Sequence, residues 1–229
     1  MIFVPVVYEG RKFERLRRFN ESAVFSGVTL RDCEFHSCDL AQWVDPAYPI
    51  RVSDVRVVGC NFFGNSVVGV QFEDVVVDGC VTGDDGLTLR GCLFRHVTLR
   101  GKVGDWIVND LHRDLSESEH AAFLTAATKF YSGVDWVLDI SDAAFESAAF
   151  FSLPGDLIRR DPETQFLVRK ERLVGVDMSS FSRVMRLRLK RVQRNAYDST
   201  VLVVGRENER FGEELSEHRK LIDLGIADA

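Results

Sequence analysis

Apolar residues return every five positions between residues 23 and 99 of this 229-residue chain. One face of a helix repeats every 3.6 residues and one face of a strand every two, so neither element alone produces a five-residue period. Fourteen units keep the spacing, with interruptions near Pro46 and within residues 83–86. Such a repeat predicts a solenoid in which equivalent positions stack. The first units are Ala23-Val24-Phe25, Val28-Thr29-Leu30, Cys33-Glu34-Phe35 and Cys38-Asp39-Leu40.

The units share one pattern, a small or branched residue, then usually a polar one, then Phe, Leu or Val. Every cysteine of the chain occupies the small inward position of a unit: Cys33, Cys38, Cys60, Cys80 and Cys92. A free cysteine packs as a small hydrophobe, and no CxxC spacing is present, so we predict buried thiols and no metal or other cofactor. Some middle residues depart from the polar pattern and predict an outer wall covered by another element: Val24, Val76, Val81 and Leu93.

Because of these five-residue units, residues 23–99 resemble the pentapeptide-repeat family. The resemblance implies a right-handed quadrilateral β-helix with four units in each coil. Fourteen units would make about 3.5 coils, a stack only ~17 Å tall at one inter-strand spacing per coil. The expected fold class is therefore mainly β with α: a short pentapeptide-repeat-like β-helix capped by a C-terminal, mostly helical region.

The segments outside the repeat are expected to cap it. Ser116 and Glu119 form a capping-box pattern, which predicts a helix over 117–132. Residues 201–204 fit either a helix in a heptad-like row that includes His218, expected to be a packing residue, or a strand. The predicted organisation is an N-terminal cap (1–19), the β-helix (20–110) with a candidate extension (134–152), a helix (111–133), and a helical region (153–229) with a candidate helical hairpin (179–225).

A basic segment between residues 183 and 194 carries six positive charges and no acid. At helical spacing, four of these charges lie on one face and make the best candidate for contact with an anion or nucleic acid: Arg183, Arg186, Lys190 and Arg194. The favoured alternative is internal neutralisation, because residues 198–229 contain eight acids. Three further polar clusters are interpreted mainly as turns or chance neighbours: Asp78/Asp84/Asp85, Asp156/Arg159/Arg160/Asp161, and Asp105/Trp106/Asn109/His112.

Composition and motifs favour a binding protein. The chain is 45% hydrophobic and 28% charged with a net charge of −6, which excludes a largely disordered chain and a wholly basic nucleic-acid coat. We find no catalytic motif, membrane span or leader, and expect a cytoplasmic, non-catalytic protein. Its partner is expected to be a protein, with the C-terminal helices as a candidate homodimer contact. The alternatives are nucleic acid on the basic helix and an enzyme site between the β-helix and the helical region.

The family resemblance also suggests mimicry of duplex DNA toward a type II topoisomerase. This chain fits that role poorly, because residues 21–102 carry a net charge of only −4.

Overall fold

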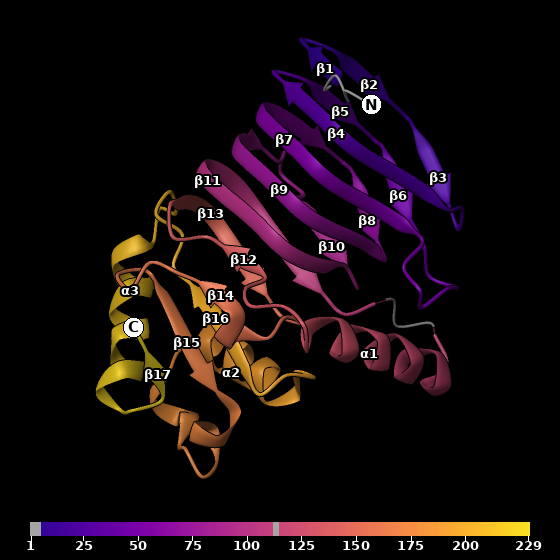
Figure 1. Cartoon of the computed structure of the whole chain (residues 1–229). Helices are drawn as coiled ribbons and strands as arrows, with labels where there is room; N and C mark the ends of the chain where they lie inside the picture. The colour runs from indigo at the N-terminus through magenta and orange to yellow at the C-terminus, as the bar shows by residue number, and fades with distance from the viewer. Residues whose placement is uncertain (1–5, 112–114) are drawn as a thin grey trace.

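Parallel strands stacked side by side dominate the computed structural model, which describes residues 6–111 and 115–229 (Figure 1). Seventeen strands of this part of the chain join one sheet. The strands up to the first helix are β1 (Val6–Glu9), β2 (Lys12–Glu14), β3 (Arg17–Phe19), β4 (Ala23–Arg31), β5 (Glu34–His36), β6 (Asp39–Ala41), β7 (Ile50–Phe63), β8 (Ser66–Val68), β9 (Val70–Val81), β10 (Leu87–Arg90) and β11 (Leu93–Asn109).

The second half of the chain mixes short strands with three α-helices, α1 (Glu117–Tyr131), α2 (Arg183–Arg194) and α3 (Phe211–Asp223). Its strands are β12 (Leu138–Asp139), β13 (Ala143–Phe150), β14 (Ile158–Arg159), β15 (Gln165–Arg169), β16 (Ser199–Val203) and β17 (Ala227–Asp228). Three short 3₁₀ turns lie between them, at Gly155–Leu157, Lys170–Leu173 and Met178–Ser180.

The five-residue spacing is explained by the register of the parallel strands. One row of branched residues crosses the sheet from strand to strand, each directly opposite the next: Val6, Val28, Val55, Val75, Val97 and Leu138. The rings of Phe13, Phe35 and Phe62 stack in a second row, with centroids 4.9 and 5.2 Å apart. Matching side chains therefore pile up along the stack and fill the core.

The expected short quadrilateral β-helix is wrong: the strands form one curled, largely parallel sheet shaped as a half-barrel. Its central strands β7, β9 and β11 are 14, 12 and 17 residues long. Two apolar, β-branched middle residues, Val76 and Val81, lie within β9 and favour an extended backbone there. A five-residue period therefore records in-register stacking, which a curled parallel sheet also provides.

The N-terminal cap and the outer wall were both expected to involve covering segments. Residues 6–19 meet the first units of the repeat as strands and extend the sheet, since β1, β2 and β3 pair in parallel with β4, β5 and β6. Of the apolar middle residues, Leu93 is buried in the core cluster that α1 joins, whereas Val24 and Val81 are exposed. The outer wall is thus covered at Leu93, partly covered at Val76 and open at Val24 and Val81.

The expected helix after the repeat is confirmed as α1, with the capping box of Ser116 and Glu119 in place. The expectation of a mostly helical region beyond residue 153 is wrong, because it contains β14 to β17 as well as α2 and α3. Strand β16 also interrupts the helical hairpin expected over 179–225. Of the two alternatives for residues 201–204, helix or strand, the strand is therefore the better description. Burial explains why these residues form a strand. Val201 to Val204 are all buried, and a strand that lies between two packed layers can be buried on both faces.

The two ends of the sheet differ in what lies against them. Strand β15 pairs antiparallel with β16 and β17, and β16 meets β13, so a second layer closes the C-terminal end. A separate hydrophobic cluster lies between these strands, α2 and α3. At the opposite end lie β1, β2 and β3 (Figure 1). Within the described residues, no helix is long and apolar enough to cross a membrane.

Candidate binding surface

Helix α2 is held against the C-terminal cluster by one face. Met185, Leu189 and Val192 are buried there, as their three- and four-residue spacing predicts. Ser182 caps the first turn by accepting a hydrogen bond from the Met185 N–H at 3.1 Å. Its hydroxyl donates to Glu217 of α3 at 2.7 Å, so the two helices are fixed to each other at this point.

The opposite face of α2 carries the four predicted cationic residues. Within the described part of the chain, no ion pair involves Arg183, Arg186, Lys190 or Arg194. Arg183, Lys190 and Arg194 are exposed, and Arg186 is half-buried. Internal neutralisation by the acidic segment therefore does not extend to these four charges.

The remaining two bases of the segment are used inside the molecule. Arg188 forms an ion pair with Glu214 of α3 at 3.1 Å. Arg191 donates to the side chain of Asn109 and lies over the Phe151 ring, 4.1 Å from its centroid. The charges of this helix thus divide into an anchoring pair and an outward group of four.

Two apolar side chains stand among the outward charges. Val184 is 49% exposed and Leu187 is 58% exposed, although neighbouring apolar residues of the helix are fully buried. Arg183, Leu187, Lys190 and Arg194 are spaced to lie along one line of the helix surface. We call this surface the α2 face: Arg183, Val184, Arg186, Leu187, Lys190 and Arg194.

Two of these cations, Arg183 and Arg186, do not favour the helix itself, whereas Arg194 lies in the last turn, where a cation is favourable. Arg183 and Arg186 lie in the first turn, which contains no acid. The N-terminal end of a helix carries partial positive charge, so each cation there costs about 0.3–1 kcal/mol at an exposed site. Arg183 and Arg186 therefore do not stabilise α2 through its dipole.

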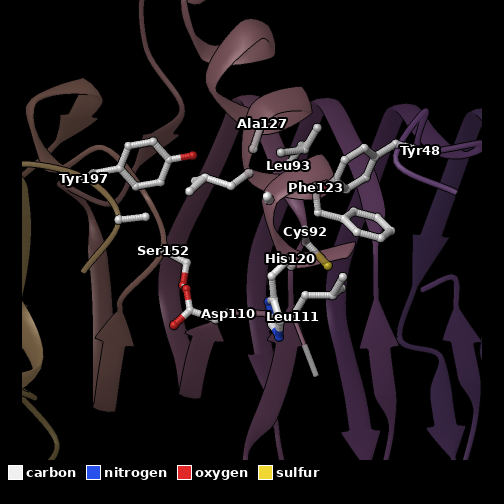
Figure 2. Close-up of a pocket in the computed structure, with 14 residues that line it drawn as sticks. Tyr48, Cys92, Leu93, Asp110, Leu111, His120, Phe123, Ala127, Ser152 and Tyr197 are labelled. Carbon is white, nitrogen blue, oxygen red and sulfur yellow. The ribbon is translucent and has the colours of Figure 1, made fainter. Parts of the chain in front are cut away.

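A pocket of about 360 Å³ lies between α1 and the sheet (Figure 2). Its lining is mainly apolar and includes Cys92 and Phe123, with Asp110, Ser152 and Tyr197 on one side. Burial raises the pKa of the Cys92 thiol to about 12, so the thiol stays protonated. The Ser152 hydroxyl donates to Asp110 at 2.5 Å and not to a histidine. Within the described residues, the lining therefore offers space for a small molecule, and neither Cys92 nor Ser152 is activated as a nucleophile.

Several of the other sequence candidates are engaged in structural contacts. Asp78 accepts from Arg100 at 2.6 Å, and among residues 6–111 and 115–229 no group of three acids, histidines or cysteines could hold a metal ion. Asp156 accepts from Ser199 at 2.5 Å and Asp161 accepts from Thr164 at 2.6 Å. His112 lies outside the described residues.

Neither the exposed pair Val184 and Leu187 nor the pocket was predicted from the sequence. An apolar residue between arginines was the available signal for the first. The pocket had no local signal, because its lining comes from six separate segments between Tyr48 and Tyr197. Comparison with protein-family models, with curated proteins and with solved structures finds no match to this chain.

Proposed function

We propose that this protein is a non-catalytic protein-binding module that docks an acidic protein segment on the α2 face. The observation that carries the proposal is a row of four cations without an ion pair in the described residues, arranged around the exposed Leu187. A partner that places carboxylates around one apolar side chain would match both features. Burial of Leu187 would supply apolar contact, and the cations would supply orientation and specificity.

The apolar pair favours a protein over nucleic acid. A phosphate backbone could contact Arg183, Lys190 and Arg194, but it offers nothing to the exposed side chain of Leu187. The whole chain carries a net charge of −6, which opposes the approach of a long polyanion. A short acidic protein segment experiences much less of this repulsion, because it meets mainly the local charge of α2.

The test is capture from cell extract with the full chain as bait, using extract with and without nuclease treatment. The altered bait carries Arg183→Glu and Lys190→Glu. The matched control carries the same change in charge elsewhere, Arg56→Glu on β7 and Lys129→Glu on α1, both in exposed positions. Far-ultraviolet circular dichroism confirms that all baits are folded.

We expect a protein that is still captured after nuclease treatment. The control bait should capture it, and the bait with Arg183→Glu and Lys190→Glu should not. For that protein in purified form, the double reversal should weaken binding at least tenfold, since tenfold corresponds to about 1.4 kcal/mol. Equal capture by both altered baits would refute the proposal. Loss of all capture after nuclease treatment would instead identify nucleic acid as the ligand.

Salt dependence distinguishes the two classes quantitatively. Four phosphate contacts on duplex DNA give a slope of about −3.6 in log affinity against log salt, or a fall of roughly 150-fold between 50 and 200 mM salt. A protein contact that also buries Leu187 should fall much less over the same range. A purified DNA duplex that binds with the steep slope would contradict the proposed function.

A further inference from the structure

The N-terminal end of the sheet presents an unpaired edge. Strands β1, β2 and β3 each pair with one neighbour, β4, β5 and β6, and no strand of the described residues pairs with their other side. Figure 1 shows these three strands at the end of the stack away from the C-terminal layer. An open strand edge is a template for another strand unless something blocks it.

Three pairs of positions along this edge are complementary about Phe13, whereas the same centre places Arg11 opposite Arg15. If two copies meet edge to edge in antiparallel orientation with Phe13 opposite Phe13, Lys12 faces Glu14 of the second copy. In the same register Glu9 faces Arg17, and Val7 faces Phe19. Each favourable contact occurs twice, because a two-fold axis relates the copies.

The backbone directions agree with this register. Arg11 accepts a hydrogen bond from the Glu34 N–H at 2.8 Å, so Arg11 and, by alternation, Phe13 direct their backbone groups toward β5. The groups of Lys12 and Glu14 then point away from β5, toward the open side. In an antiparallel pair, two such residues directly opposite each other exchange both of their N–H to C=O bonds.

The outer strands follow the same rule. The Gly10 N–H donates to Arg31 and the Asn20 N–H donates to Ala41, which places both residues on the paired side. By alternation, Val7 and Glu9 of β1 and Arg17 and Phe19 of β3 face the open side. These six residues therefore direct their backbone groups away from the strands of the described chain with which β1, β2 and β3 pair.

Exposed apolar surface lies at the same place. Val7 is 56% exposed and Phe19 is 45% exposed, and each would be covered by the other in the paired register. Of the C-terminal helices expected to form a homodimer contact, α3 packs Leu215 and Ile222 on the C-terminal cluster, whereas α2 exposes Val184 and Leu187. An end-to-end contact would cover apolar residues that the C-terminal layer cannot reach.

We propose that a second copy of this chain occupies the open edge, joining β1, β2 and β3 of the two copies in antiparallel register centred on Phe13. This inference is independent of the α2 face, which lies at the other end of the molecule. The ion pair of Lys12 and Glu14 within one chain, at 2.5 Å, would be supplemented by the same pairing across the two-fold axis.

Charge exchange at two positions tests the register. Lys12→Glu places two carboxylates opposite each other, and Glu14→Lys places two ammonium groups opposite each other, so each variant alone should be a monomer of about 25.9 kDa by analytical ultracentrifugation. The wild-type chain should sediment at twice that mass. Mixing the two variants restores opposite charges across the axis, and the mixture should return to the dimeric mass. Both side chains are more than half exposed, so the fold should tolerate the changes.

Lys129→Glu on α1 serves as the control for loss of one positive charge and should remain dimeric. A wild-type chain that stays monomeric up to 100 µM would refute the proposal. A dimer that both single variants retain, or that the mixture fails to restore, would place the contact elsewhere and overturn the proposed register.

Discussion

Replacement of Tyr131 by Phe should measure how α1 completes the sheet. The Tyr131 hydroxyl accepts a hydrogen bond from the backbone N–H of Phe94 in β11 at 3.3 Å. Phe94 is 1% exposed and Tyr131 is 6% exposed, so water cannot easily replace the lost oxygen. The ring stays in place in the variant, and the change isolates the hydroxyl group.

The expected cost is that of leaving one buried N–H without a partner, about 1–3 kcal/mol in the free energy of unfolding. At about 2 kcal/mol, the melting temperature of a chain of this size should fall by roughly 4–8 °C. Urea unfolding followed by circular dichroism gives the free energy, and a scan of temperature gives the shift independently.

Tyr197 supplies a matched control because its ring lies 5.7 Å from that of Tyr131. Its hydroxyl lines the pocket shown in Figure 2, and no hydrogen bond of this group is found in the described part of the chain. Tyr197→Phe should therefore change stability by less than about 0.5 kcal/mol. Equal stability of Tyr131→Phe and wild type, or equal loss in both variants, would refute the reasoning.

Three further predictions concern buried and bridging groups. Burial raises the pKa of Cys80 and Cys92 to about 12, so iodoacetamide at pH 8 should label neither in the folded chain and both in guanidinium; labelling of the folded chain would contradict this. Burial lowers the pKa of His218, so the unfolded chain takes up a proton near pH 6.5 while the folded chain does not, and stability should fall as the pH drops below that value. Urea unfolding at pH 7.5 and 5.5 should show that His218→Leu no longer loses stability at the lower pH. A variant with the same pH dependence as the wild type would contradict this role of His218. The hydrogen bonds to Asp135 and then Asp74 raise the pKa of His96, so a ring titration by nuclear magnetic resonance should give a value above 6.5 that Asp135→Asn lowers; no change in that variant would exclude the bridge.

The repeat in the sequence predicted which side chains stack, but not the shape of the sheet. Val28, Val55 and Val75 do lie opposite one another, as equivalent positions of a solenoid should. The curvature of the sheet depends on how far each strand remains extended between bends. A period of five residues is compatible with more than one such curvature. The resemblance supplied the four-sided coil, and the structure replaces it with a curled sheet.

Helix α2 was predictable, whereas the state of its charges was not. The spacing of Met185, Leu189 and Val192 follows from local sequence, whereas the start expected at Ser179 or Ser180 is found at Ser182. Whether the acids of the C-terminal segment reach Arg183 depends on where α3 packs, which only the tertiary structure decides. Glu214 and Glu217 reach Arg188 and Ser182, and the outward cations remain beyond them.

A photo-crosslinker at position 187 shows whether the α2 face contacts a protein, as proposed. Benzoylphenylalanine would replace Leu187 in one variant and Leu124, an exposed residue of α1, in a control. After irradiation in nuclease-treated extract, we expect one prominent acidic protein to be crosslinked at position 187 and to be absent from the control. No crosslinked protein at position 187, or the same set of proteins at both positions, would contradict the claim.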